Sequence, residues 1–301
     1  MAATKMVCIS APQNTFMNRQ SPPHNTFWLS IVTITFNNFE NLLDTVESVR
    51  DLEHCEHLII NGGNCLKTLE YLKNFSGISI SEPDQGISDA FNKGIKLSTG
   101  DAIIMLNSGD TLIDQNYPAR ASQILDQYPD IDFVHADLIF EDKFIGPYIM
   151  QPLRSGNSLY PNIGRGMPYR HQSMVVRKEV FDRVGLFDME YICCDYDWVC
   201  RWELGLKISK GKAYYLQGNP VIIMDGGGVS SQNESKVILE AFQIILKHNM
   251  NSGFLTKVIT YSALFKRIFL YSCRFILIRM GYVNILKKMK SLKYINNLTI
   301  P

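Results

Sequence analysis

The stretch "AIIMLNSGD" at residues 102–110 decides the fold of this chain, because an apolar run passes directly into polar and small residues. A continuous apolar run of this length is typical of a strand that is buried on both faces of a sheet. Gly109 allows a ligand to approach the backbone, and the Asp110 carboxylate suits a hard divalent cation. The alternative is an ordinary turn, in which Asp110 or Asn107 bonds its own backbone.

The same kind of element recurs on the N-terminal side of this stretch. Runs of β-branched and apolar residues predict strands at 28–35, 57–60 and 78–81. Apolar residues at helical spacing predict helices between the strands, at 42–52, 66–72 and 87–97. Alternation of strands and helices predicts a mostly parallel α/β sheet flanked by helices. Every one of these strands ends in polar residues, and open α/β sheets bind ligands at the carboxyl ends of their strands.

The second half of the chain has a more mixed pattern. Helices are expected at 117–128, 178–184, 195–204 and 231–248, and strands at 133–139, 173–176 and 213–224. The glycine- and proline-rich stretch 152–168 predicts a loop. Residues 1–26 are polar and aperiodic and predict a flexible leader. We therefore expect a single globular domain over 27–250, followed by a tail over 251–301.

Composition bounds the class of protein. The chain of 301 residues is 46% hydrophobic and 20% charged, as expected of a soluble globular protein. Seven scattered cysteines with no C-x-x-C pair favour neither a disulfide framework nor a structural zinc site. These features, and an N-terminus without a long apolar run, predict a reducing, cytoplasmic setting.

The tail differs sharply in charge from the rest of the chain. Ten of the 30 basic residues follow Glu240, whereas none of the 29 acidic residues does. Residues 254–294 interleave these cations with bulky apolar residues, which suits an interfacial helix on an anionic membrane. A helix packed on the domain and a partner-binding or dimer helix are the alternatives. Nucleic-acid binding is disfavoured because no recognition motif accompanies the charge.

A second acidic segment, "CCDYDWVCRW" at 193–202, offers a candidate base. Asp195 at the start of a helix would be exposed and able to accept a proton from a hydroxyl. Its alternative role is that of an N-cap. Asp197 is expected to pair with Arg201 at i,i+4 on the same helix, and Cys193 and Cys194 are expected to be packing residues.

Residues 27–231 resemble family 2 glycosyltransferases of the GT-A fold. The resemblance rests on motifs in the family's order: "LSIVTITFNN", "LIINGGNCLKTLEYL", "SEPDQGISDAFNKGIKLSTGD", "AIIMLNSGD", "HQSMVVRKEVFDRVGLFD", "CCDYDWVCRW" and "GGGVSS". It implies an α/β fold with a Rossmann-like, mostly parallel sheet. It also implies that "AIIMLNSGD" stands where the family has its metal-binding Asp-x-Asp motif.

The resemblance assigns candidate roles to individual residues. The expected nucleotide-sugar-binding residues are Thr35, Asn37, Asn61, Asp84, Asp89, Asn92, Lys93 and Asn107. Asp110 is the expected ligand of a divalent metal, Mn or Mg, and Asp195 the expected base. His171 is expected on the acceptor or diphosphate side, with a buried core histidine as the alternative. For Asp89, Asn92 and Lys93, the alternative is helix capping and a solvated face.

Two residues depart from the family pattern. Asn61 replaces an aspartate that holds the base, and an amide oxygen is a neutral acceptor. Ser108 replaces the first acid of Asp-x-Asp, which leaves Asp110 as the single carboxylate of that motif and the diphosphate as the source of the remaining ligands. A catalytically silent nucleotide-sugar- or membrane-binding homologue is therefore one alternative function. A sugar-phosphate nucleotidyltransferase is another, but no glycine-rich loop follows the first strand.

The implied function is an inverting glycosyltransferase of the hexosyltransferase type. The donor would be a UDP- or GDP-sugar, and the acceptor a hydroxyl of a glycan or lipid-linked molecule in cell-surface polysaccharide or lipopolysaccharide synthesis. A lipid-linked acceptor fits a peripheral location on the inner face of the cytoplasmic membrane.

Overall fold

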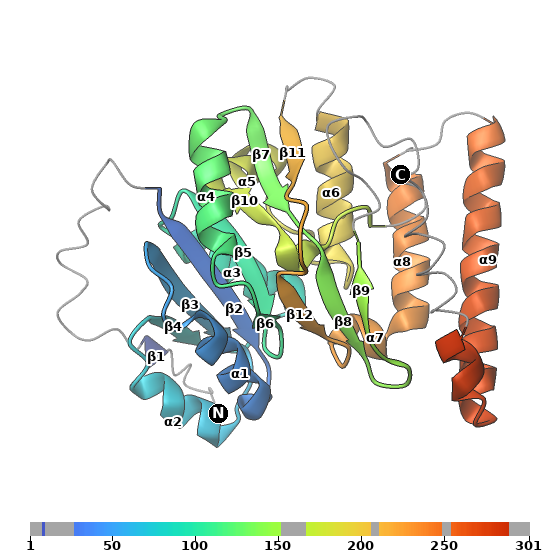
Figure 1. The fold of residues 1–301 in the computed structure, drawn as a ribbon, viewed down its shortest axis with the longest axis horizontal. Helices are drawn as coiled ribbons and strands as arrows, with labels where there is room; N and C mark the ends of the chain where they lie inside the picture. Colours follow the sequence, from blue (N-terminus) through green and yellow to red (C-terminus); the bar gives the residue numbers. More distant parts are fainter. Residues whose placement is uncertain (1–7, 10–26, 152–166, 206–210, 249–253, 289–301) are drawn as a thin grey trace, which may run out of the picture.

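The computed structural model describes residues 8–9, 27–151, 167–205, 211–248 and 254–288. In this part of the chain, two sheets are surrounded by helices (Figure 1). The larger sheet runs in the order β1 (Cys8–Ile9), β4 (Ile78–Ser81), β3 (Cys55–Asn61), β2 (Leu29–Thr35), β5 (Ala102–Asn107), β10 (Val175–Arg177), β7 (Ile131–His135), β11 (Lys212–Tyr215). The smaller runs in the order β6 (Thr111–Leu112), β12 (Ile222–Asp225), β8 (Leu138–Asp142), β9 (Gly146–Met150).

The N-terminal half is the predicted parallel sheet. Strand β2 pairs in parallel with both β3 and β5, and β3 pairs in parallel with β4. The connecting helices are α1 (Phe39–Val49), α2 (Leu66–Lys73) and α3 (Ile87–Leu97). The chain winds from β2 outward through β3 and β4 and then returns to the other side of β2 as β5. This reversal creates a topological switch point between β2 and β5, where α/β sheets commonly bind ligands.

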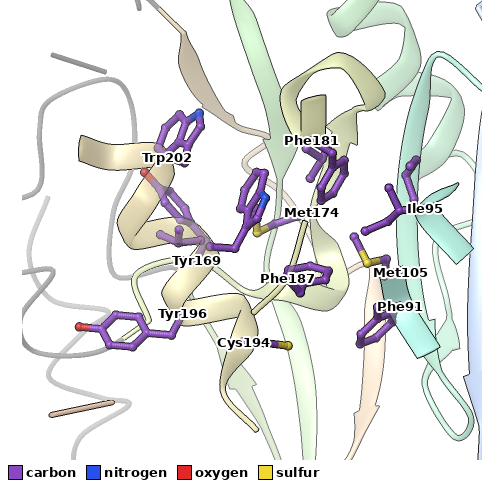
Figure 2. Packing of buried hydrophobic residues seen from close by; sticks show 14 of the residues in the cluster. Phe91, Ile95, Met105, Tyr169, Met174, Phe181, Phe187, Cys194, Tyr196 and Trp202 are labelled. Carbon is purple, nitrogen blue, oxygen red and sulfur yellow. The ribbon is translucent and has the colours of Figure 1, made fainter. Parts of the chain in front are cut away.

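Both faces of this sheet are buried, which explains its continuous apolar strands. Val32 and Ile34 of β2 point to the face covered by α3, whereas Leu29 and Ile31 point to the opposite face. The opposite face is covered by α4 (Tyr117–Gln127). On the α3 face, side chains from α5 (Lys178–Val184) and α6 (Cys194–Gly205) complete a large core rich in aromatic residues (Figure 2).

The structure corrects two predicted strands. The predicted strand at 133–139 is two strands, β7 and β8, which leave one sheet and enter the other at Ala136-Asp137. The predicted strand at 213–224 is likewise divided into β11 and β12. The two pairs run together, because β11 is parallel to β7 and β12 is parallel to β8. The chain therefore crosses between the sheets twice, at neighbouring points.

Other predictions differ from the structure by one or a few residues. Strand β10 begins two residues later than expected, because His171–Ser173 forms a 3₁₀ turn, η2. The helix predicted at 231–248 is divided into α7 (Val229–Gln232) and α8 (Glu234–Lys247). Most of the predicted loop at 152–168 and most of the leader lie outside the described residues.

The tail forms a long helix, α9 (Phe254–Arg279), followed by a helical segment at 283–288. It lies beside α8 (Figure 1), where the rings of Phe242 and Tyr261 are 5.3 Å apart. Arg274 forms an ion pair of 2.7 Å with Asp142, a buried residue at the end of β8. One face of α9 is thus packed on the domain. Within the described residues, no helix is both long enough and apolar enough to cross a membrane.

Candidate active site

The carboxyl ends of the parallel strands bring the predicted nucleotide-side residues to one edge of the sheet. Thr35 is paired in register with Asn61, and Asn61 with Ser81. On the other side of β2, Ile34 is paired with Asn107. Residues from four segments that are distant in sequence therefore meet at the switch point, as the polar strand ends predicted.

The end of β2 combines an unbonded hydroxyl with a fixed turn. Thr35 is 4% exposed, and its Oγ1 has no hydrogen-bond partner among the described residues. Asn37 adopts a positive φ of 52°, and its Oδ1 accepts hydrogen bonds from the backbone N–H groups of Asn64 and Cys65, at 2.8 and 2.9 Å. A side chain at Gly63 would collide with Asn37. Asn37 therefore holds the loops after β2 and β3 together.

Asn61 is fully buried, and its amide is used within the protein. Its Nδ2 donates to Ser81 Oγ at 2.8 Å and to the carbonyl oxygen of Gly63 at 3.1 Å, while its Oδ1 accepts from the Gly63 N–H at 3.1 Å. An aspartate could not donate the first two bonds. The departure from the family pattern is thus explained by the shape of this loop, which the Asn61 amide stabilises.

The segment between β4 and α3 and the first two turns of α3 contain a charged, mutually bonded group. Lys93 Nζ is 3.0 Å from Glu82 Oε1 and 3.2 Å from Asp89 Oδ2. Asp89 also accepts a hydrogen bond of 3.0 Å from the Gln85 N–H, and Asp84 accepts one of 3.0 Å from the N–H of Gly86. Glu82 was expected only as part of a polar strand end and was given no role of its own. These bonds fix the entry to α3 beside the strand-end loops.

Asn92 is placed behind this group and not on the open edge. It is 6% exposed, its Nδ2 donates to the carbonyl oxygen of Phe187 at 2.9 Å, and its Oδ1 accepts from the Phe187 N–H at 2.9 Å. Both polar atoms are therefore bonded to the segment that precedes α6. The geometry gives Asn92 a supporting role between α3 and that segment.

At the end of β5, the turn that decides the fold contains a buried carboxylate. Asp110 is 1% exposed, and its Oδ2 accepts hydrogen bonds from the backbone N–H and the Nδ2 of Asn107, at 2.8 and 2.9 Å. Burial raises the pKa of Asp110 to about 7, although the bonds from Asn107 oppose that rise. The Asn107 Oδ1 is buried and has no hydrogen-bond partner among the described residues. The expected turn is thus present, and it leaves one amide oxygen free.

A second carboxylate adjoins this turn. The backbone N–H of Asp225, the last residue of β12, donates to Asp110 Oδ1 at 3.2 Å, and Asn41 Nδ2 donates to Asp225 Oδ2 at 3.4 Å. A Cβ on Gly109 would lie 3.2 Å from Asp225 Oδ2. Sequence reasoning missed Asp225, although it directly precedes the motif "GGGVSS". Ser108 donates to the Asn38 carbonyl oxygen at 3.0 Å.

These groups fit a hard divalent cation. No cluster of three or more histidine, cysteine or acidic side chains suited to a metal occurs in the described ranges. Asp110, Asp225 and the orphaned Asn107 Oδ1 nevertheless supply two carboxylates and one amide oxygen. Mg²⁺ and similar cations accept such oxygen ligands and usually complete their shell with water and substrate phosphates.

The candidate base lies near the candidate acceptor-side histidine. Asp195 is in the first turn of α6, and its Oδ1 accepts a hydrogen bond of 2.8 Å from the N–H of Tyr196. Burial lowers the pKa of His171, and the negative charge of Asp195 partly opposes that change. The His171 Nε2 is buried without a hydrogen-bond partner in the described chain. Its ring lies 5.5 Å from that of Phe91 on α3.

Asp197 has a structural role. It is fully buried and pairs with Arg201 Nε at 2.8 Å, which confirms the predicted i,i+4 pair. Its other oxygen is 2.8 Å from His248 Nε2 and 3.5 Å from Lys247 Nζ. Asp197 therefore joins α6 to the end of α8, while Asp195 remains partly exposed.

Comparisons with known proteins are consistent with this geometry. Residues 30–185 match the model of glycosyl transferase family 2. An uncharacterized glycosyltransferase of Mycobacterium tuberculosis is 28% identical over 189 residues, which cover 58% of this chain and 69% of the relative. A PGL/p-HBAD biosynthesis glycosyltransferase of Mycobacterium bovis is 24% identical over 156 residues, covering 48% of this chain and 57% of the relative.

Solved structures share the fold. Staphylococcus aureus TarS, residues 1–349, in complex with UDP-GlcNAc matches with a TM-score of 0.59 at 12% identity, over 80% of this chain and 72% of that one. A mannosyltransferase of Pyrobaculum calidifontis in complex with GDP-Man and Mn²⁺ matches with a TM-score of 0.54 at 11% identity, over 88% and 85%. The predicted GT-A fold is confirmed.

Proposed function

The chain belongs to glycosyl transferase family 2, and we propose that it transfers a hexose from a nucleotide-diphosphate sugar to an acceptor hydroxyl with inversion at the anomeric carbon. The donor base would be uracil or guanine, the bases bound in the UDP-GlcNAc and GDP-Man complexes of the structural neighbours. The acceptor would be a glycan or a lipid-linked molecule of cell-surface polysaccharide synthesis.

One observation carries this proposal. Thr35 Oγ1, Asn107 Oδ1 and His171 Nε2 are buried polar atoms that lack hydrogen-bond partners among the described residues. Burying a polar atom without a partner costs about 1–3 kcal/mol, so such atoms are rare in native proteins. These three atoms belong to residues that the sequence motifs selected. We therefore infer that a bound polar ligand supplies their missing hydrogen bonds.

Asp195 is proposed as the base. In the transfer, the acceptor oxygen forms a bond to the anomeric carbon, the bond from that carbon to the diphosphate oxygen breaks, and the hydroxyl proton passes to the Asp195 carboxylate. A hydroxyl has a pKa far above neutrality, so a positioned carboxylate is needed to accept its proton during attack. Asp195 is partly exposed in the first turn of α6 and can be reached by an acceptor.

Asp110, Asp225 and Asn107 are proposed to hold a divalent cation, Mn²⁺ or Mg²⁺. When bound, such a cation neutralises the charge that develops on the departing diphosphate. Asp225 would supply the carboxylate that Ser108 does not. The Asp110 carboxyl must be ionised to act in this way, and the positive charge of a cation favours its ionised form.

The proposal is tested with a panel of nucleotide sugars, assayed for hydrolysis or transfer with Mn²⁺ or Mg²⁺. We expect Asp195→Asn to lower kcat about 10²–10⁴-fold. Asp182→Asn, which changes an exposed carboxylate on α5, is the matched control and should be unaffected. An Asp195→Asn variant that turns over at the wild-type rate would refute the assignment of Asp195 as the base. Tight nucleotide binding without any turnover would instead favour a catalytically silent binding protein.

We also propose that α9 rests on the inner face of the cytoplasmic membrane. Its outer face exposes Phe265 and Phe269 at 73 and 59%, with exposed Lys266 beside them. Apolar residues mixed with cations favour an anionic lipid surface. In co-sedimentation with phosphatidylglycerol vesicles, the double variant Phe265→Ser, Phe269→Ser should bind several-fold more weakly.

The control for this test is Leu66→Ser on α2, where an 80% exposed apolar side chain lies on a different element. Vesicle binding that is equal in the wild type and in the double variant would show that α9 is not the anchor.

A further inference from the structure

Glu240 is a buried acid on α8 that lies outside the strand-end site. Its side chain is 4% exposed, and α8 lies beside α6 (Figure 1). One carboxylate oxygen, Oε2, accepts hydrogen bonds from the backbone N–H groups of Ile192 at 2.7 Å and Cys193 at 3.2 Å. The Cys193 thiol is 3.5 Å from the same oxygen. Glu240 therefore holds the main chain immediately before α6.

The other oxygen of Glu240 contributes little to this contact. Oε1 is buried and has no hydrogen-bond partner among the described residues. The nearest cation is Lys236 Nζ at 3.7 Å, on a side chain that is 63% exposed. An ion pair with so exposed a lysine is screened by water and adds little stability. Burial of the Glu240 carboxylate is thus compensated chiefly by the bonds to Oε2.

Cys193 connects Glu240 to the first turn of α6. Its N–H is bonded to Glu240, whereas its carbonyl oxygen accepts hydrogen bonds from the N–H groups of Tyr196 and Asp197, at 3.1 and 3.3 Å. Asp195 lies inside this turn, and its Oδ1 accepts a hydrogen bond of 2.8 Å from the Tyr196 N–H. A displacement of Cys193 would therefore move the turn that carries the Asp195 carboxylate.

The segment before α6 is also held from the side of α3. Ser88 is buried, and its Oγ donates to the carbonyl oxygen of Tyr191 at 3.1 Å. Asn92 bonds both main-chain groups of Phe187. The segment is thus bonded to α3 on one side and to α8 on the other. Of these bonds to the main chain, those of Glu240 are the nearest in sequence to α6.

We propose that Glu240 is a positioning residue for the sugar transfer, because it fixes the turn from which the Asp195 carboxylate faces the acceptor hydroxyl. This inference rests on the proposed function, which assigns the base. A misplacement of about 1 Å can lower the rate of a reaction about 10²-fold. The role depends on where the acceptor oxygen lies and not on its charge, since an amide oxygen in the same place would also accept both N–H groups.

Two conservative substitutions separate position from charge. Glu240→Gln keeps the length of the side chain and an acceptor oxygen, so kcat should stay within about threefold of the wild type although neutral hydrogen bonds are weaker. Glu240→Asp keeps the charge but withdraws the oxygens by one methylene, about 1.5 Å. We expect it to lower kcat about 10–100-fold, with the donor KM unchanged.

The matched control is Asp132→Glu. Asp132 is another buried carboxylate bonded to α6, because it accepts a hydrogen bond of 2.7 Å from Trp202 Nε1 near the opposite end of that helix. Lengthening this side chain by one methylene should lower Tm through overpacking and leave kcat, measured well below Tm, unchanged. Equal kcat in Glu240→Asp and Asp132→Glu would overturn the inference. A lower kcat in Glu240→Gln than in Glu240→Asp would also overturn it, because charge would then matter more than position.

Amide hydrogen exchange of the full chain tests the contact without turnover. In Glu240→Asp, exchange over residues 191–197 should be at least about tenfold faster, because hydrogen bonds to a charged group are lost and the turn opens more often. In Asp132→Glu, exchange over the same residues should match the wild type. Unchanged exchange in Glu240→Asp would overturn the inference, whatever the turnover.

Failure of this inference is distinguishable from failure of the proposed function. Wild-type turnover that is lost in Asp195→Asn but unchanged in Glu240→Asp would refute the positioning role alone. Absent turnover with every nucleotide sugar would refute the proposed function and overturn the positioning role with it.

Discussion

Asp195 and Asp197 are two residues apart on α6, and substituting each by asparagine should have opposite consequences. Asp197 is fully buried and faces Arg201, His248 and Lys247, at 2.8, 2.8 and 3.5 Å. Removing one partner of a buried ion pair costs about 3–5 kcal/mol, and the partial exposure of Arg201 and Lys247, at 24 and 42%, places this site at the lower end of that range. At about 2–4 °C per kcal/mol for a domain of this size, Asp197→Asn should lower Tm by roughly 10 °C.

Asp195→Asn should change activity and leave stability almost intact. The Asp195 carboxylate is partly exposed and bonds the N–H of Tyr196. A charge near a helix N-terminus contributes only about 0.3–1 kcal/mol, so Tm should move by no more than a few degrees. Loss of a general base, in contrast, lowers kcat by about 10²–10⁴.

Thermal unfolding followed by circular dichroism, and turnover measured well below the lower Tm, separate the two effects. An Asp197→Asn variant as stable as the wild type would refute the reasoning about the buried pairs. An Asp195→Asn variant with a normal kcat would refute the role of Asp195 as the general base. Loss of kcat in Asp197→Asn while it is fully folded would show that the two residues act together and not separately.

Three further predictions follow from single contacts. Burial raises the pKa of Asp110 to about 7, so below that pH a cation must displace a proton. Mn²⁺ affinity should therefore fall about tenfold for each unit by which the pH is lowered. This dependence on pH should be shallower in Asp110→Asn. Asn92→Ala leaves the buried N–H and carbonyl of Phe187 unbonded, which should cost about 2–3 kcal/mol in urea unfolding without changing the donor KM. Arg274→Ala removes the α9 ion pair and should speed amide exchange in α9 while that of β2 stays unchanged.

The N-terminal half of the fold was readable from the sequence because its signals are local. Strand 78–81 and helix 87–97 have the observed bounds, since apolar periodicity and flanking polar residues mark both of them. The break at Ala136-Asp137 carries neither glycine nor proline, so the apolar run through it read as one strand. The division is set by pairing with β11 and β12, about 80 residues later, which no local pattern reveals.

The candidate site was readable to the same extent. The register of β2, β3 and β5 follows from parallel pairing, so the strand-end residues could be expected to meet. Asp225 could not be found in this way, because its contact with Asp110 spans 115 positions and depends on the smaller sheet. The internal use of Asn61 was equally hidden, since its partners include Ser81 on the next strand.

The smaller sheet connects the features on which the proposals rest. Strand β12 is antiparallel to β6, which directly follows Asp110, and parallel to β8, which ends at Asp142. Asp225 therefore reaches the turn after β5, while Asp142 holds α9 through Arg274. A shift of α9 would act on the Asp142 end of β8, and β8 is hydrogen-bonded to β12. The donor corner and the tail are thus two parts of one hydrogen-bonded unit.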